Sequence, residues 1–403
     1  MPFSNASWVR FNLHEQFSRV KDKLFAVNDL KPGINVYGYF NSVFGIAESA
    51  RAFYNALLLS AIPFCLVPIG SKIHERFNFE DVWAKKMEEH FESNPPYSTN
   101  LILANAPELP HLRRKFGQRR FAGRYNIGVW AWELEDYFPF NDGLAFVDEL
   151  WLYSNFIYES IKKHTSKPVR KITYPFIPSW GPLEESKAVR KKYGINCDCF
   201  VFFYNFDFHS SIERKNPDGA IEAFKEAFPD KIDDVRLVLK TLHANKHQPE
   251  CGRLMRTINK DPRVIWIDKA IPRNHLTSLV NASDCYLSLH RSEGLGLGMM
   301  EAMYLGKCTI GTAYGGNMDF MDSHNSLLVG YTKTEVKEDF GPYKKGKLWA
   351  EPDIGEAAED MKSAYENRNM VRYIGEKAAA DIRSRMDPRK TVSEINKWAQ
   401  IRF

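Results

Sequence analysis

Two glutamates and three glycines in one short stretch have the residue types and spacing needed to bind a phosphorylated ligand. Glu293 and Glu301 enclose Gly294, Gly296 and Gly298. A glycine-rich turn at the start of a helix directs unpaired backbone N–H groups and the positive end of the helix dipole to one point, which favours an anion such as phosphate. Carboxylates on either side of this turn accept hydrogen bonds from hydroxyl groups. The stretch therefore predicts a sugar-nucleotide site.

The spacing of the two glutamates argues against glycosidase chemistry. A glycosidase holds its two carboxyl groups about 5 to 9.5 Å apart across one bond. On one continuous helix, Glu293 and Glu301 would lie about 12 Å apart along the axis. We therefore expect the two carboxylates to have different roles. The alternative is an ordinary strand-to-helix turn whose glutamates cap the helix and face water.

A buried strand and a helix are expected to position this turn. Residues 285–289 form a short apolar run, typical of a parallel strand that is covered on both faces. From Leu297 onward, apolar residues recur at helical spacing, so a helix follows the turn.

The same order of strand, glycine and helix occurs near the beginning of the chain. Residues 34–40 predict a strand. The helix that follows this strand is expected to begin at Ser42 or Gly45. Ligands of open α/β sheets bind at such turns, so this turn is a second candidate for a ligand site. The alternative is a plain turn, because a single glycine is a weak signal.

The glutamates and several later motifs together resemble one enzyme family. The glutamates stand in the frame Ser-Glu-Gly-x-Gly-x-x-x-x-Glu-Ala-Met, and Gly306-Lys-x-x-Ile-x-Thr-x-Tyr-Gly-Gly-Asn317 and Trp349-Ala-Glu-Pro-Asp353 follow. This order resembles the retaining glycosyltransferases of the GT-B, family-4 type (glycosyl transferases group 1), and is similar to bacterial polysaccharide and O-antigen assembly enzymes. The resemblance is dense in the C-terminal half and thinner in the N-terminal half.

The resemblance implies an α/β fold of two Rossmann-like domains whose parallel sheets face a central cleft. Residues 1–178 would bind the acceptor, residues 179–385 would bind the nucleotide sugar, and a C-terminal helix in residues 386–403 would pack on the first domain. A chain of 403 residues is also longer than one hydrophobic core usually supports. Three prolines between residues 172 and 182 predict the linker.

The resemblance also implies roles for residues of the second domain. Glu301 would bind the ribose of the donor, and Glu293 would bind hydroxyls of the transferred hexose at the catalytic centre. The other expected donor-binding positions are Gly294, Leu295, Gly296, Leu297 and Asn317.

In the first domain, the resemblance implies that the turn near residue 45 approaches the acceptor or the donor diphosphate. Gly45, Glu48 and Arg51 are the candidate residues for that contact.

A basic loop before residue 217 is expected to bind the donor diphosphate. The resemblance places a catalytic lysine there, Lys215, together with an arginine about six residues upstream, where this chain has His209. Arg214 or Lys240 would then supply the second positive charge. The alternative is that these are exposed cations at helix ends.

An aromatic and acidic segment follows the strand predicted at 126–131. Trp132 would stack on the face of a sugar, and Glu133 is the candidate for the catalytic group nearest the acceptor hydroxyl. The ligand of this segment is either the acceptor or the donor. The alternative is that the tryptophans pack between layers and the acids begin a helix.

Composition restricts cofactors and location. No Asp-x-Asp occurs, and the six cysteines fit no zinc spacing, so neither a metal nor another cofactor is expected beyond the nucleotide sugar co-substrate. A net charge of +5 argues against a nucleic-acid binder. No run of 18 apolar residues occurs, so we expect a cytoplasmic protein. Residues 8–27, a predicted amphipathic helix, and residues 111–124, with six positive charges, would either pack or face solvent, or contact the inner face of an anionic membrane.

The function that this resemblance implies is retaining transfer of a hexose, for which mannose is a mild preference. The donor would be a nucleotide-diphosphate sugar and the acceptor a glycan or lipid-linked glycan in polysaccharide or lipopolysaccharide biosynthesis. Two alternatives stay open: a catalytically silent sugar-nucleotide-binding partner of another transferase, and a sugar-nucleotide epimerase of the same architecture.

Overall fold

The computed structural model describes residues 29–42, 44–70, 82–136, 138–139, 141–178, 180–229, 232–259 and 261–403. The helix predicted at residues 8–27 lies outside the described residues. The chain divides into two compact units. The first consists of the described parts of Met1–Trp132 and Tyr137–Ile177 with Met386–Phe403, and the second of Glu133–Asp136 and Pro178–Arg385. The expected first domain contained Glu133–Asp136, which the contacts group with the second unit.

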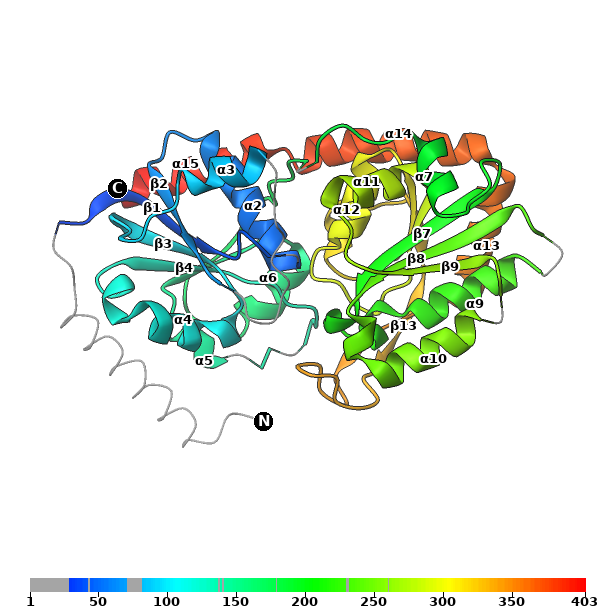
Figure 1. Cartoon of the computed structure of the whole chain (residues 1–403). Coiled ribbons are helices and arrows are strands. Elements are labelled where there is room, and N and C mark those ends of the chain that lie inside the picture. The colour runs from blue at the N-terminus through cyan, green and yellow to red at the C-terminus, as the bar shows by residue number, and fades with distance from the viewer. Residues whose placement is uncertain are drawn as a thin grey trace. The chain divides into compact units, whose positions relative to one another are not determined.

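The first unit is built on a parallel sheet with helices on both faces. The strand order is β2-β1-β3-β4-β5-β6, so the chain runs outward from β1 in both directions. The helices α2 and α15 cover one face, and α4 and α5 cover the other (Figure 1). The strands are β1 (Lys31–Gly38), β2 (Phe64–Pro68), β3 (Tyr97–Leu103), β4 (Tyr125–Val129), β5 (Glu149–Leu152) and β6 (Val169–Lys171). The helices are α2 (Gly45–Leu58), α3 (Val82–Glu88), α4 (Leu109–Phe116), α5 (Asn141–Leu144), α6 (Asn155–Lys162) and α15 (Pro388–Arg402), with 3₁₀ helices η1 (Ala106–Glu108) and η2 (Gln118–Arg120).

Helix α15 belongs to the first unit although it follows the whole second unit in sequence. The carboxylate of Glu394 accepts from the backbone N–H of Thr173 at 2.8 Å and from its hydroxyl at 2.9 Å. The indole of Trp398, which is buried, donates to the buried carboxylate of Glu149 at 3.2 Å. These contacts fix the helix that was predicted in residues 386–403 to the edge of the sheet formed by β5 and β6.

The second unit repeats the parallel arrangement, with the strand order β12-β11-β10-β7-β8-β9. The chain runs from β7 to β8 and β9 in one direction, and from β10 to β11 and β12 in the other. The carboxyl ends of β7 and β10 therefore form the point where the strand order reverses, which is where open α/β sheets bind ligands. The strands of this sheet are β7 (Phe200–Asp207), β8 (Val235–Leu242), β9 (Val264–Asp268), β10 (Cys285–Ser288), β11 (Cys308–Thr312) and β12 (Leu327–Val329).

Two helical layers cover the second sheet, because its strands are apolar on both faces. Helix α7 packs on α11 and α12 on α14, while α9 packs on α10 and α13. An antiparallel pair, β13 (Tyr331–Glu335) with β14 (Leu348–Pro352), extends from the unit. The helices are α7 (Ser186–Lys192), α8 (Ile212–Lys215), α9 (Pro217–Ala227), α10 (Gln248–Ile258), α11 (Arg273–Ala282), α12 (Leu297–Tyr304), α13 (Ile354–Glu366) and α14 (Arg368–Arg385), with 3₁₀ helices η3 (Phe208–Ser210), η4 (Ala244–Lys246) and η5 (Gly316–Asp319).

The basic run at residues 111–124 is partly structural. The guanidinium of Arg124 is buried and donates to the carbonyls of Tyr97, Arg119 and Pro95 at 2.8 to 2.9 Å. Arg114 and Lys115 are exposed. Among the described residues, none of the helices combines the length and the apolar character needed to cross a bilayer.

Candidate functional site

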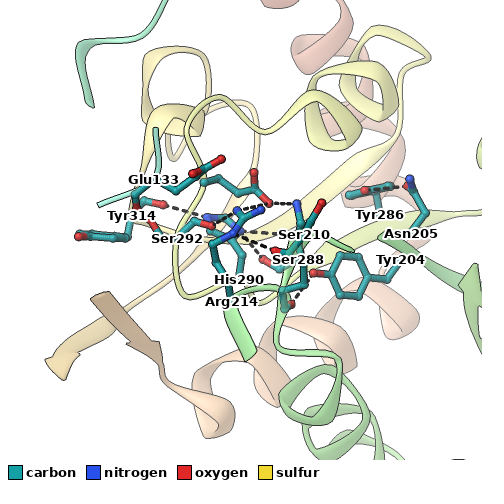
Figure 2. Close-up of polar contacts among 12 residues, drawn as sticks. Glu133, Tyr204, Asn205, Ser210, Arg214, Tyr286, Ser288, His290, Ser292 and Tyr314 are labelled. Atoms are coloured by element: carbon teal, nitrogen blue, oxygen red, sulfur yellow. Dashed lines mark hydrogen bonds and ion pairs between the residues drawn. The ribbon is translucent and has the colours of Figure 1, made fainter. Parts of the chain in front are cut away.

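Hydrogen bonds join the loop after β7 to the loop after β10. The side-chain amide of Asn216 donates to the carbonyl of Leu289 at 2.9 Å, and the N–H of Arg291 donates to the carbonyl of Arg214 at 2.8 Å. The guanidinium of Arg214 donates in return to the carbonyl of Ser292 at 2.7 Å. Figure 2 shows Arg214 at the centre of these contacts, with Ser210 and Ser292 beside it. The two loops therefore form one polar cluster at the point where the strand order reverses.

Glu293 is the carboxylate of this cluster, and it faces both predicted cations. Its Oε1 contacts the ammonium of Lys215 and lies 3.4 Å from Nη1 of Arg214. Glu293 is 9% exposed and Arg214 4% exposed, so water screens these charges weakly. Removing one partner of such a buried pair typically costs about 3 to 5 kcal/mol.

The protonation state of the pair follows from burial and charge. Burial alone would raise the pKa of Glu293, but the Lys215 ammonium and the Arg214 guanidinium lower it to about 2. Burial also lowers the pKa of Lys215, an effect that Glu293 opposes. Glu293 is therefore ionised at neutral pH, and it can accept hydrogen bonds but cannot donate them.

The glycine turn after Glu293 has no space for side chains. Gly296 has a φ of +90°, in the left-handed region, and is the N-cap residue that precedes α12. A Cβ atom on Gly298 would lie 2.2 Å from the hydroxyl of Tyr286, and one on Gly316 would lie 1.8 Å from the carbonyl oxygen of Gly294. The N–H of Gly316 donates to the carbonyl of Glu293 at 2.7 Å. The turn is therefore clamped between β10 and the loop that follows β11.

The start of α12 supplies the N–H groups that the sequence predicted for phosphate. Leu297 is the first helical residue, and the first intrahelical bond runs from the N–H of Met300 to the carbonyl of Gly296 at 3.0 Å. The N–H groups before it have no partner within the helix, and the helix dipole is positive at this end. Leu295, in the turn itself, is buried.

Glu301 lies on α12 and forms an ion pair with Arg273, the first residue of α11. The Arg273 guanidinium lies 5.5 Å from the centroid of the Trp180 ring, within the range of a cation–π contact. The side chains of Glu301 and Arg273 are 14% and 21% exposed. Arg273 thus fixes one oxygen of a partly accessible carboxylate.

Asn317 and His290 are buried polar residues beside the turn. The side-chain amide of Asn317 donates to the carbonyl of Thr312 at 3.0 Å, and within the described part of the chain its Oδ1 has no hydrogen-bond partner. Nε2 of His290 lies 2.8 Å from the carbonyl of Tyr314, so this nitrogen carries the proton. Burial lowers the pKa of His290, and the ring is neutral at pH 7.

Glu133 belongs to the second unit and joins the same cluster. The hydroxyl of Tyr343, in the loop between β13 and β14, donates to Oε2 of Glu133 at 3.0 Å. The hydroxyl of Ser292 donates to the backbone carbonyl of Glu133, and Figure 2 shows Glu133 beside Ser292 and Tyr314. The ring of Tyr343 is buried and lies 5.7 Å from the Arg214 guanidinium. Glu133 is thus held close to Arg214 and Glu293.

Lys240 and His209 lie beside this cluster, Lys240 on the neighbouring strand β8 and His209 at the start of the loop after β7. Lys240 is on β8, buried, and its ammonium donates to the carbonyl of Thr241 at 2.9 Å. Burial lowers the pKa of Lys240 to about 8. His209 lies on η3, where Nδ1 is 2.8 Å from Nε2 of His247. Of the residues offered as the second cation, Arg214 is the one that lies beside Lys215 and faces Glu293.

The charged candidates from the first unit contact residues of the loop that precedes α2 and each other. Arg51 is buried, donates to the carbonyls of Phe40 and Ser42 at 2.8 and 2.9 Å, and pairs with Glu48 at 2.7 Å. Gly45 is the first residue of α2. Trp132 is 2% exposed and meets Phe138 edge-on at 6.1 Å. The burial of Trp132 thus agrees with the alternative that the tryptophans pack between layers.

Sequence reasoning missed the residues that support the site. Tyr343 and Arg273 lie outside every motif, and each reaches its partner only through the tertiary fold. Arg291 was also missed: its guanidinium forms a bidentate pair with Glu351 at 2.7 Å for each bond, which ties the loop after β10 to β14. The sequence signal for Arg291 was its place two residues before Glu293.

This arrangement can bind an extended ligand that is anionic at one end and rich in hydroxyls elsewhere. Arg214, Lys215 and the start of α12 provide positive charge and N–H donors. Glu293 and Glu301 provide acceptors on two sides of the turn. These residues alone account for both types of contact, those to anionic groups and those to hydroxyl groups.

Comparison with known proteins identifies similar folds. Residues 190–381 match the family model described as glycosyl transferases group 1. HepE from Anabaena, solved in complex with UDP and glucose, is similar with a TM-score of 0.64 and 14% identity over 92% of this chain and 100% of that chain. A glycosyltransferase from Rickettsia africae is similar with a TM-score of 0.63 and 11% identity over 92% of this chain and 98% of that chain.

Sucrose-phosphate synthase from Thermosynechococcus elongatus is also similar, with a TM-score of 0.59 and 12% identity over 92% of this chain and 98% of that chain. A search of curated protein sequences finds no significant match. The two Rossmann-like units therefore form a GT-B fold, which confirms the predicted fold class.

Proposed function

We propose that this chain, whose residues 190–381 belong to the glycosyl transferases group 1 family, transfers a hexose from a nucleotide-diphosphate sugar to a glycan acceptor with retention of the anomeric configuration. The observation that carries this proposal is the placement of Arg214, Lys215 and Glu293 together at the reversal point of the second sheet, beside the start of α12. The structure of Anabaena HepE in complex with UDP-glucose supports a donor of this class.

In the proposed mechanism, the second unit stabilises the leaving diphosphate. Negative charge grows on the diphosphate as the glycosidic bond to it breaks, and Lys215, Arg214 and the N–H groups at the start of α12 lower the energy of that charge. An ammonium has three N–H donors, so Lys215 can donate to a phosphate oxygen and still hold Glu293. The acceptor hydroxyl attacks the anomeric carbon from the face that the diphosphate leaves, and the proton of this hydroxyl passes to an oxygen of the departing diphosphate.

The carboxylates orient the donor. Glu293, ionised, accepts from hexose hydroxyls, and Glu301, whose other oxygen is held by Arg273, accepts from the ribose. Glu133 keeps its proposed place near the acceptor hydroxyl, oriented by Tyr343. The donor base is open between uracil, which HepE binds, and guanine.

The test is a thermal-shift screen of the full chain against UDP, GDP, dTDP and ADP and their sugar conjugates. A ligand at 100 times its Kd stabilises the fold by about 2.7 kcal/mol. We expect a shift with one nucleotide family that Glu301→Ala weakens. The matched control is Glu359→Ala, which removes an exposed glutamate from α13.

Turnover then separates the alternatives. We expect nucleoside diphosphate to be released in proportion to glycosylated acceptor, with the anomeric configuration followed by NMR. Nucleotide binding without turnover would favour a silent partner, and conversion of the donor without acceptor would favour an epimerase. If no nucleotide raised the melting temperature, the result would contradict all three hypotheses: the transferase, the silent partner and the epimerase.

A further inference from the structure

The loop between β13 and β14 brings a buried aromatic ring to the polar cluster of the second unit. We call residues 336–347 the hairpin loop. Its Gly341 and Gly346 have φ angles of +59° and +78°, in the left-handed region that favours glycine. Residues 341–346 are exposed except Tyr343, which is 6% exposed. The hairpin loop therefore lies at the surface of the unit and directs the Tyr343 side chain inward.

A series of stacked groups holds the hairpin loop to the loop that carries Glu293. The guanidinium of Arg291, two residues before Glu293, lies 5.7 Å from the centroid of the Trp349 ring. The rings of Trp349 and Phe340 stack with centroids 5.9 Å apart and an interplanar angle of 14°. Phe340 and Tyr343 exchange two backbone hydrogen bonds of 2.9 and 3.1 Å. The position of Tyr343 is thus fixed relative to the loop after β10.

Tyr343 and Ser292 together fix Glu133. The Tyr343 hydroxyl donates to Oε2 of Glu133 at 3.0 Å, and the Ser292 hydroxyl donates to the Glu133 carbonyl. The Tyr343 ring lies 5.7 Å from the Arg214 guanidinium, within the range of a cation–π contact. Glu133 is therefore held at its backbone and at its side chain, and the same tyrosine covers part of Arg214.

One oxygen of Glu133 is left for a ligand. Glu133 is partly exposed, and its Oε1 has no hydrogen-bond or ion-pair partner among the residues that the structure describes. Burial lowers the pKa of Lys215, and the charges of Glu293 and Glu133 oppose that change, so the Glu133 carboxylate lies close enough to act on the cations of the donor site. A hydroxyl that approaches the diphosphate would meet Oε1.

We propose that Tyr343 is a positioning residue that holds Glu133 for the acceptor and directs the hexose to the acceptor rather than to water. The proposal rests on the proposed function. A sugar acceptor carries several hydroxyls, so Oε1 of Glu133 can accept from a hydroxyl beside the attacking one, which keeps its own proton for the departing diphosphate. Rigid orientation of this kind lowers the barrier to reaction, and small misplacements are costly.

Hydrolysis is the reaction that competes with transfer. In it, the oxygen of water bonds to the anomeric carbon while the bond to the diphosphate breaks, and one proton of the water passes to the diphosphate. The products are free hexose and nucleoside diphosphate. The Tyr343 ring occupies space beside Arg214 that water would otherwise fill, and exclusion of water from a site prevents this side reaction.

The test is steady-state kinetics of the full chain with separate measurement of glycosylated acceptor, free hexose and nucleoside diphosphate. Tyr343→Phe removes the hydrogen bond to Glu133 and keeps the ring. We expect kcat/KM for the acceptor to fall about 10- to 100-fold, as loss of a hydrogen bond to a charged group does, with an unchanged Kd for the donor nucleotide. Tyr343→Ala also removes the ring and should increase the share of donor that is lost to water.

A double-mutant cycle tests whether Tyr343 acts through Glu133. Glu133→Ala removes the carboxylate that the tyrosine holds. In the Glu133→Ala background, Tyr343→Phe should lower kcat/KM for the acceptor by less than about threefold further, because coupled residues are not additive. Losses that multiply in full would show that the two residues act independently and would overturn the proposal.

The matched control is Tyr373→Phe, which alters a tyrosine on α14 that is 60% exposed and should leave all rates unchanged. Circular dichroism establishes that each variant is folded. Equal kcat/KM for the acceptor in the unaltered chain and in folded Tyr343→Phe would overturn the proposal. An equal share of hydrolysis in Tyr343→Phe and Tyr343→Ala would overturn the role of the ring in excluding water.

The same measurements separate this proposal from the proposed function. If the unaltered chain released nucleoside diphosphate neither with an acceptor nor with water, the transferase itself would be refuted. If the unaltered chain transferred hexose and Tyr343→Phe did so equally well, the transferase would stand and the role of Tyr343 would be refuted.

Discussion

The two units place a glycine-containing turn at the same point of the same kind of sheet, yet they use their charges differently. In the first unit, Arg51 is committed to two carbonyls of its own loop and to Glu48. In the second, Arg214 and Lys215 come from the loop of a neighbouring strand and face Glu293 across the reversal point. Under the proposed function, a position at the reversal point is not sufficient for anion binding. A second loop must bring cations that the first loop does not consume.

The glycines of the two turns also differ, in the space that surrounds them. Nothing lies within 4 Å of a Cβ added to Gly45, whereas such an atom on Gly298 or Gly316 would overlap neighbouring atoms. The first turn tolerates a side chain, and the second is closed around its backbone. The contrast predicts which substitutions each turn accepts.

The largest expected effect is on turnover in the second unit. Lys215→Ala removes a charge that stabilises the leaving group, and loss of one such group typically lowers kcat about 10²- to 10³-fold. Steady-state kinetics with the donor found in the nucleotide screen measures it. Lys187→Ala, at an exposed position on α7, is the control. A decrease in kcat of less than tenfold would mean that Lys215 does not stabilise the charge of the leaving diphosphate.

The next effect is on acid stability. The pKa of Glu293 is about 2 in the fold, against a reference of 4.5. The folded pKa is lowered, so its stabilisation is full above pH 4.5 and is lost as pH falls towards 2; the contribution is about 3 kcal/mol. Urea unfolding between pH 6 and pH 3 should show a steeper loss for the unaltered chain than for Glu293→Gln. Parallel pH profiles would refute the ion pair.

The glycine contrast predicts an intermediate effect. Gly316→Ala forces the loop after β11 away from Gly294 and should lower the free energy of unfolding by about 1 to 3 kcal/mol. Gly45→Ala should be neutral or stabilise the chain by about 0.4 to 1 kcal/mol, because it restricts only the unfolded chain. Urea denaturation of both variants compares the turns directly. Equal losses of stability in the two variants would mean that the two turns do not differ in the space they leave for a side chain.

The smallest effect concerns Arg51. Arg51→Lys keeps the positive charge, but one ammonium cannot hold the two carbonyls, which accept from Nη1, and also the carboxylate of Glu48, which contacts Nη2. We expect a loss of about 1 kcal/mol in the free energy of unfolding and an unchanged nucleotide Kd. A weaker nucleotide affinity in a variant of native stability would return Arg51 to the donor site.

Elements with strong local signals were predictable. The apolar run at residues 285–289 became β10, and the helical spacing from Leu297 became α12. Glu293 and Lys215 were identified from motifs that keep a fixed spacing from these elements. Each of these predictions depends on a few neighbouring residues, which is the range over which sequence periodicity carries information.

Partners that meet only through the tertiary fold were not predictable. Tyr343 reaches Glu133 across 210 residues, and Arg273 reaches Glu301 across 28. Trp132 could be read either as a sugar platform or as packing, because an aromatic residue at a strand end fits both, and only its burial against Phe138 distinguishes them.

The discontinuity of the first unit has a consequence for synthesis. Trp398 and Glu394 are translated only after residues 178–385, so the ribosome completes the second unit before the first can bury Glu149 against its indole partner. Until then the first sheet lacks the helix that covers its β5–β6 edge. The nascent chain is therefore expected to acquire protease resistance in the second unit first, against the order of translation.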